Sequence, residues 1–231
     1  MTIKVSFKNN IVENKIKNYI LFSDDKFKVL GLSKTSLSKD ANLINKIITN
    51  NVLKDKNFFT FNINPNQKAI IIKLKNSLSP IEIEKLGAEF YSHIKENQIT
   101  NSTILENNLR EFIKINKDLI DQFIHGAKLK SYKFDKYKTK KKNKLFELDI
   151  LTKNKSLKPS KNMKFTSLIE GINFTKDLVS EPGNVLHPDE YAKRLIQLKK
   201  IGLEVNVFDK KKLKKLGMHA LLGVGQGSIR G

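Results

Sequence analysis

The sequence predicts an α/β protein with a mixed sheet and flanking helices, followed by a second, smaller α/β unit. Strand-like and helix-like patterns alternate over the first 150 residues, as they do in α/β domains. Turn-forming residues at 64–66 separate two apolar runs and predict an antiparallel hairpin. Eight of the 11 glycines lie after residue 170, and this shift indicates a distinct second unit. A chain of 231 residues is long enough for two modest domains.

Apolar periodicity predicts the first elements of the sheet. Ile3 to Phe7 and Tyr19 to Phe22 have the composition and alternation of strands. Ser36 to Ile48 carries its apolar residues at helical spacing, which predicts a helix. Phe58 to Ile63 and Ala69 to Leu74 are the two strands expected in the hairpin.

A capping box marks the start of the next helix. Ser79 supplies a hydroxyl for an early backbone N–H, and Pro80 suits the first helical position. Glu82 lies three residues after the cap, where its carboxylate can return a bond. We expect this helix to run through Ile94.

Three further elements complete the first part. Ser102 to Leu105 is predicted to be a short strand, Leu109 to Leu129 a single helix, and Leu145 to Leu151 a strand. Lys153 to Lys161 is polar and without pattern, so a domain boundary is expected near it.

The second part is expected to contain helices that lead into a β-α-β unit. A long helix is predicted from Phe165 onward, and a second helix is opened by Pro188. Leu203 to Phe208 and Ala220 to Val224 are predicted strands, with a helix at Lys210 to Leu216 between them.

The net charge of +21 raises the hypothesis of nucleic-acid binding, because basic surfaces gain affinity by releasing counterions from phosphate. Almost all of the basic residues are lysines, and arginine is found only at Arg110, Arg194 and Arg230. Base readout favours guanidinium groups. Lys, Asn and Ile are all abundant and have AT-rich codons, so genomic base bias is the simpler explanation.

The segment from Lys136 to Lys144 concentrates six lysines. A solvated loop or strand edge explains such a run, since lysine also discourages pairing between sheet edges. Tyr132, Phe134 and Tyr137 interleave with the basic residues, which keeps a nucleic-acid-binding or regulatory module as the alternative function.

The absence of cysteine excludes disulfides, thiolate metal sites and thiol nucleophiles. The N-terminus has no basic and then apolar leader, and no apolar run approaches the length that spans a bilayer. A soluble, cytoplasmic protein that does not contact membranes is expected.

Several short blocks near the end of the chain carry a family resemblance. They are Asp177-Leu178-Val179, Glu181-Pro182, Asn184-Val185-Leu186, Pro188, Glu190, Leu216-Gly217-Met218 and Gly223-Val224-Gly225-Gln226-Gly227-Ser228. In order and spacing they resemble the opening of the catalytic domain of the leucyl (cytosol) aminopeptidases. Gly126 and the run from Tyr132 to Thr139 resemble the segment that precedes the domain junction in that family. The resemblance covers about residues 120 to 231.

The resemblance implies a division into domains. Residues 1–150 are expected to form a non-catalytic, macro-domain-like α/β domain, and residues 151–162 a linker. Residues 163–231 are expected to form the truncated start of a metallopeptidase catalytic domain, an incomplete α/β fold.

The resemblance also implies the chemistry of the family, which removes N-terminal residues from peptides with two divalent metal ions, commonly zinc, manganese or magnesium. Such ions polarise the scissile carbonyl and generate hydroxide at neutral pH. In the family the ligands lie downstream of the Gly-Gln-Gly-Ser segment, and this chain ends a few residues after it. We therefore assign no catalytic, metal-binding or cofactor-binding residue, and we expect no metal to bind this chain.

Family members commonly assemble as hexamers, but contacts made by the missing part are not expected here. Activity is expected only when a complementary C-terminal chain is present.

A search independent of the family gives no site either. The acidic pairs Asp24-Asp25 and Glu147 with Asp149 are expected to be turn and solvated-strand residues, since no histidine or third carboxylate lies nearby. The glycines at 223, 225 and 227 lack the Rossmann spacing and are expected to permit a tight strand exit and close packing.

The four histidines, His93, His125, His187 and His219, are isolated from one another in the sequence. They therefore lack the spacing of metal ligands.

His187 precedes the helix-opening proline at a position where the family usually has a small hydroxyl residue. It is expected to be a poorer helix cap than that residue.

Overall fold

The computed structural model describes residues 2–10, 15–50, 57–75, 77–113, 117–140, 144–153 and 163–227. The chain divides into two compact units, Met1–Gly171 (unit 1) and Ile172–Gly231 (unit 2). The division falls within helix α5 (Met163–Ser180), which therefore contributes residues to both units.

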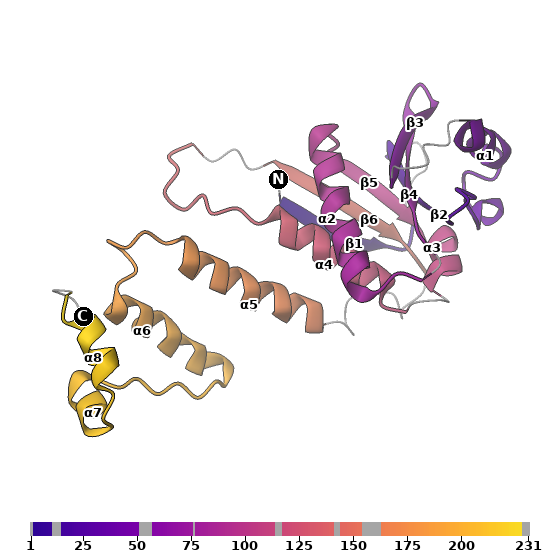
Figure 1. Cartoon of the computed structure of the whole chain (residues 1–231). Coiled ribbons are helices and arrows are strands. Elements are labelled where there is room, and N and C mark those ends of the chain that lie inside the picture. Colours follow the sequence, from indigo (N-terminus) through magenta and orange to yellow (C-terminus); the bar gives the residue numbers. More distant parts are fainter. Residues whose placement is uncertain are drawn as a thin grey trace. The chain divides into compact units, whose positions relative to one another are not determined.

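Unit 1 is built on a sheet whose strand order, within the described residues, is β1-β6-β5-β2-β4-β3 (Figure 1). All neighbouring strands are parallel except β3 and β4, which form an antiparallel hairpin. The predicted mixed sheet is confirmed, and each strand expected in the first 150 residues is present. The strands are β1 (Thr2–Lys8), β2 (Asn18–Ser23), β3 (Phe58–Asn64), β4 (Gln67–Lys73), β5 (Asn101–Leu105) and β6 (Leu145–Leu151).

Helices cover both faces of this sheet (Figure 1). Helices α2 (Pro80–Glu96) and α4 (Leu119–Ser131) pack on one face and form the larger apolar core with it. Helix α1 (Ala41–Asn50) packs on the opposite face in a second core. The sheet is thus the middle layer of a three-layer arrangement, as expected for parallel strands.

Strand β2 shows how the sequence serves both cores. Ile20 and Phe22 belong to the core under α2 and α4, whereas Tyr19 and Leu21 belong to the core under α1. All four side chains are at most 1% exposed. Because successive side chains point to opposite faces of a strand, a continuous apolar run is required here.

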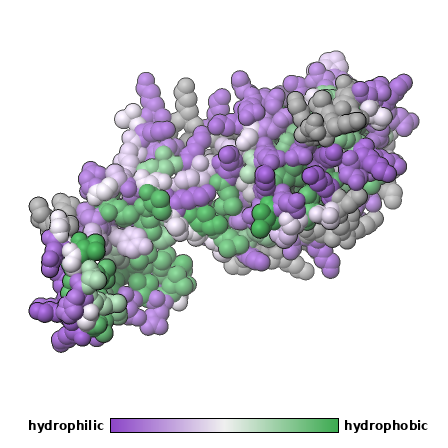
Figure 2. Space-filling view, viewed as in Figure 1, coloured by the Kyte–Doolittle hydropathy of each residue, from purple (hydrophilic) through white to green (hydrophobic). Residues whose placement is uncertain are grey.

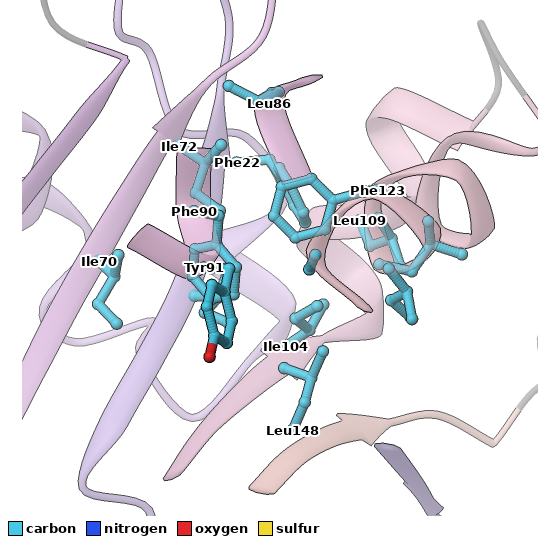
Figure 3. Close-up of a cluster of buried hydrophobic side chains, with 14 of the residues drawn as sticks. Phe22, Ile70, Ile72, Leu86, Phe90, Tyr91, Ile104, Leu109, Phe123 and Leu148 are labelled. Atoms are coloured by element: carbon cyan, nitrogen blue, oxygen red, sulfur yellow. The ribbon is translucent and has the colours of Figure 1, made fainter. Parts of the chain in front are cut away.

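Aromatic side chains fill the larger core between the sheet and the two helices (Figure 3). The rings of Phe22 and Phe123 meet edge to face, with centroids 5.8 Å apart, and Phe90 lies 5.1 Å from Phe123. Phe22 comes from β2, Phe90 from α2 and Phe123 from α4, so this cluster joins three elements that are distant in sequence. Such ring pairs add about 0.5–1.5 kcal/mol each beyond area burial.

Helices α2 and α4 approach each other closely at two glycines. A Cβ atom added to Gly87 would lie 1.9 Å from the carbonyl oxygen of Phe123. One added to Gly126 would lie 1.9 Å from the carbonyl oxygen of Glu84. Each helix therefore rests a glycine on the backbone of the other, and no side chain fits between them.

The predicted capping box of α2 is confirmed. The backbone N–H of Glu82 donates to Ser79 Oγ at 3.3 Å, and the N–H of Ser79 donates to Glu82 Oε2 at 2.8 Å. These bonds from Ser79 lower the pKa of Glu82. Pro80 occupies the first turn, as expected.

The helix predicted from Ser36 begins later in the structure. Backbone bonds of Ser38 to Thr35 and of Asp40 to Leu37 close tight turns over this stretch. The helical bonding pattern starts only when the N–H of Ile44 donates to the Asp40 carbonyl, so α1 begins at Ala41. The apolar spacing predicted which face of α1 is buried, but it did not predict the residue at which the helix begins.

The single helix predicted from Leu109 to Leu129 is wrong, because this stretch contains the end of one helix and most of another. Helix α3 (Glu106–Ile113) directly follows β5, and α4 begins at Leu119. The fully buried side chain of Asn108 holds α3 against β2. Its Oδ1 accepts from the Phe22 N–H at 2.7 Å and its Nδ2 donates to the Phe22 carbonyl at 2.9 Å. A single straight helix could not both bond to β2 through Asn108 and pack along α2.

The described residues of unit 2 contain helices but no strand, so the two strands predicted there are wrong. Residues 203–208 have no regular structure, and the stretch predicted as the second strand lies in α8. A strand needs a neighbour for its backbone hydrogen bonds, whereas a helix makes them internally. The unit contains the end of α5, then α6 (Pro188–Ile196), a 3₁₀ helix, η5 (Gln197–Ile201), α7 (Lys210–Lys215) and α8 (His219–Gly225).

Replacing Gly87 with alanine is expected to destabilise unit 1 by at least about 2 kcal/mol, because a methyl group forces α2 and α4 apart. Gly171→Ala is the matched control: Gly171 lies within α5, and an added Cβ meets no atom within 4 Å. Alanine there is expected to be neutral or slightly stabilising. Urea unfolding of the variants measures both effects, and equal stabilities for the two would contradict the close-packing assignment.

Stability is expected to fall on acidification because of His93. Its Nε2 lies 2.8 Å from Thr60 Oγ1, its ring stacks on Phe58, and burial lowers its pKa from the ordinary value of 6.5. Below pH 6.5 the His93 ring takes up a proton in the unfolded chain but not in the folded chain. Each unit by which folding lowers its pKa therefore costs up to about 1.4 kcal/mol of folding free energy at acidic pH. Stability is therefore full above about pH 6.5 and decreases towards the folded pKa.

Urea unfolding between pH 5 and 8 measures this dependence. His93→Gln is expected to flatten the profile, with His219→Gln, at an exposed site on α8, as the control. An unchanged profile in the His93 variant would assign the dependence to another group.

Candidate functional site

An ion-pair network organises the junction between α5 and α6 in unit 2. Glu181 follows α5, and its side chain is 1% exposed. Arg194 of α6 donates from Nη1 to Glu181 Oε1 at 2.8 Å and from Nε to Glu190 Oε1 at 3.1 Å. Hydrogen bonds to these two carboxylates raise the pKa of Arg194. A buried carboxylate needs such a partner, so Arg194 holds the turn between the helices in place.

His187 occupies the N-cap position of α6 but makes no side-chain capping bond. Its Nδ1 pairs with the carboxylate of Asp189 instead, and this hydrogen bond lowers the pKa of Asp189. The expectation of a poor cap is confirmed. Helix α7 has a better one, since the Lys212 N–H donates to Asp209 Oδ1 at 2.8 Å.

Unit 2 exposes an unusual number of large apolar side chains (Figure 2). Val179, Ile201 and Val224 are 81%, 75% and 82% exposed. Contiguous exposed apolar patches are typical of interaction sites. The other exposed members are Tyr191, Ile196, Leu203, Val207, Phe208, Leu216, Met218 and Leu221.

The glycine-rich segment does not form the strand exit expected from the sequence. Gly223 and Gly225 lie in α8 and Gly227 in the turn after it. A Cβ at any of the three would meet no atom within 4 Å, so the expectation of close packing is wrong. Gly202 and Gly217 lie in the left-handed region that favours glycine, since their φ angles are +90° and +70°.

Acidic and histidine side chains do not converge in the part of the chain that the structure describes. No group of three or more could hold a metal ion there. Asp24 closes a turn by accepting from the backbone of Lys26 and Lys28, and Asp149 pairs with Lys8 Nζ at 2.7 Å. Asp24 therefore has the turn role expected of it, and Asp149 lies in strand β6, where its carboxylate is ion-paired.

His125 has a structural environment in unit 1. It is 4% exposed, its Nδ1 lies 3.1 Å from Glu84 Oε1, and its ring lies 5.2 Å from that of Phe165. It therefore joins α4 to α2 and to the start of α5.

The lysine-rich segment is only partly described, because Lys141 and Lys142 lie outside the described residues. The ring of Tyr137 meets Phe134 at 5.8 Å and lies under Lys136 Nζ at 5.6 Å. Nucleic-acid binding by this segment stays a prediction. No helix in the described ranges is long and apolar enough to cross a membrane.

Sequence-based reasoning missed one polar cluster, at the carboxyl ends of β5 and β6. Glu106 Oε1 accepts from Arg110 Nε at 2.6 Å, and Oε2 accepts from the backbone N–H of Lys153 at 2.9 Å. Burial alone would raise the pKa of Glu106, but these bonds and one from Thr152 outweigh it and lower the pKa. Only the spacing of Glu106 and Arg110, one helical turn apart, could have signalled the pair.

Comparisons with known proteins show what the last part of the chain is similar to. Residues 173–231 match the family model described as "Cytosol aminopeptidase family, catalytic domain". An α/β sheet domain is thus followed by a segment related to a peptidase catalytic domain.

Curated relatives carry the same family name. The chain is 44% identical over 124 residues to a probable cytosol aminopeptidase of Phytoplasma mali, covering 51% of this chain and 25% of that protein. It is 29% identical over 228 residues to the one from Nitrobacter hamburgensis, covering 91% and 44%. The chain is similar to the cytosol aminopeptidases over these lengths, and the resemblance predicted from its sequence is confirmed. It spans less than half the length of these relatives.

Solved structures agree on the fold. A mutant of tomato leucine aminopeptidase superposes with a TM-score of 0.67 at 19% identity, over 94% of this chain and 46% of that chain. The bottromycin maturation enzyme BotP gives 0.61 at 15% identity, over 93% and 44%.

Replacing Arg194 with methionine is expected to open the junction between α5 and α6, because the carboxylate of Glu181 loses its cation. Hydrogen–deuterium exchange should rise at residues 181–196, while Arg110→Met should leave that segment unchanged. Protection in the Arg194 variant equal to that of the parent would show that the network does not hold the turn.

Proposed function

We propose that these 231 residues are part of a leucyl-type aminopeptidase, which releases N-terminal amino acids from peptides with two divalent ions such as manganese or zinc. The match of residues 173–231 to the catalytic-domain model carries this proposal. The name of the relatives supports a cytoplasmic location.

The two parts of the chain take different roles in this proposal. Residues 1–150 form a non-catalytic domain, 151–162 a linker, and 163–231 a portion of the catalytic domain. In this proposal the metal-binding and catalytic groups belong to the part of the relatives' length that these 231 residues do not span.

The exposed apolar side chains of unit 2 support the need for that further polypeptide. Side chains such as Ile201, Leu221 and Val224 are each more than half exposed. Full burial of such a side chain stabilises by roughly 1.5–3 kcal/mol. We infer that the remainder of the catalytic domain covers them and that the 231 residues are inactive without it.

Hydrolysis of leucine amide with added manganese tests this function. The 231 residues alone should give no turnover, whereas adding the polypeptide that matches the remaining length of a family relative should restore it. Turnover by the 231 residues alone would refute the proposed division of roles. No turnover when both pieces are present and shown to associate would refute the proposed activity.

A variant pair tests the covering surface. Leu221→Asp is expected to reduce association with the added polypeptide at least about tenfold, because it places a charge in an apolar contact. Lys200→Asp adds the same carboxylate on η5 and should change association by less than about twofold. Equal effects would show that charge, rather than apolar burial, governs association.

A further inference from the structure

Unit 1 contains a cavity of about 450 Å³ at the carboxyl edge of its sheet. Its wall includes residues at or just after the ends of three parallel strands: Asn9 after β1, Leu105 in β5 and Leu151 in β6. Thr35 and Ser36, from the segment after β2, also line the cavity. Cavities of this size commonly accommodate small molecules.

The cavity lies where the chain connections diverge. After β2 the chain continues to α1, which packs on one face of the sheet, and after β5 it continues to α3 and α4. Helix α4 packs on the opposite face, and β2 and β5 are neighbours. Ligands of open α/β sheets bind at such points, outside the carboxyl ends of the strands.

The charge of the wall favours an anion. Among the described residues that line the cavity, Glu106 is the only acid, and Arg110 and the Lys153 backbone already bond to it. Arg110 and Lys153 also line the cavity, so its described lining holds two basic residues and one acid, and the Arg110 side chain is 53% exposed. The first turn of α3 also lines the cavity, and its backbone N–H groups favour negative charge.

The rest of the lining favours a ligand with many hydroxyls. Amides of Asn9, Asn10 and Asn107 and hydroxyls of Thr35 and Ser36 outnumber the apolar side chains there. An amide can donate and accept several hydrogen bonds. The cavity is larger than a free phosphate needs and has room for a small organic molecule.

We propose that this cavity binds a small polyhydroxylated anion, of the size of a sugar phosphate. The anionic group is held by Arg110, Lys153 and the start of α3. The hydroxyls are held by the asparagine amides and by Thr35 and Ser36. This site lies wholly within unit 1 and does not depend on the aminopeptidase proposal.

Isothermal titration calorimetry with the full chain and D-glucose 6-phosphate tests the site. Glucose carries only the hydroxyls of this ligand and inorganic phosphate only its anionic group. Each should bind at least about tenfold more weakly than glucose 6-phosphate. Gluconate carries a carboxylate in place of the phosphate ester. If gluconate binds as tightly as glucose 6-phosphate, the site accepts organic anions generally. If gluconate binds more weakly, the site is selective for phosphate esters.

Two variants locate the binding. Lys153→Ala should weaken glucose 6-phosphate about tenfold, whereas Lys130→Ala, which removes an exposed lysine of α4, should change it less than about twofold. Ser36→Phe keeps both cations but fills the cavity, and it should abolish binding while thermal melting confirms folding.

Three results would overturn the proposal. One is that neither glucose 6-phosphate nor gluconate binds more tightly than glucose and phosphate. The second is equal weakening by the two lysine variants, which would indicate general charge attraction. The third is unchanged affinity in a folded Ser36→Phe variant.

Discussion

The close approach of α2 and α4 is the constraint on which unit 1 depends. Gly87 rests on the backbone of Phe123, and Gly126 rests on the backbone of Glu84. Because the contact is reciprocal, it fixes the distance between the helices and their position along each other. The aromatic cluster of Phe22, Phe90 and Phe123 closes only at that separation (Figure 3). Protein interiors are packed too densely for the cluster to adjust to a wider gap.

Local signals in the sequence were sufficient for most of unit 1. Strands were predictable because both faces of the sheet are covered, so runs such as 69–72 are continuously apolar. The capping box at Ser79 was predictable because its bonds join residues three apart. Helix starts and breaks were less predictable. The separation of α3 from α4 depends on the bonds of Asn108 to Phe22, 86 residues away, and no local pattern reports such a contact.

The failed strand predictions in unit 2 have a different cause. Residues 203–208 and 220–224 have apolar patterns that suit strands, yet a pattern only states which faces seek burial. Pairing requires a neighbouring strand, and the described residues of unit 2 contain none. Their apolar side chains are largely exposed (Figure 2). The packing partners that would bury these side chains in a sheet are therefore not among the described residues. The same mismatch motivates the proposal that further polypeptide covers this unit.

The polar edge of unit 1 shows why a candidate site can be harder to predict than a fold. Glu106, Arg110 and Lys153 are unremarkable in a chain with 44 basic residues. They meet because β5 and β6 are parallel neighbours whose ends reach the same edge. The bond from the Lys153 backbone to Glu106 then joins the end of β6 to the start of α3. Asn108 anchors that helix to β2, so the position of the cavity wall depends on strands that lie far apart in the sequence. A site of this kind follows from the order of strands in the sheet, and that order is not written in any single segment.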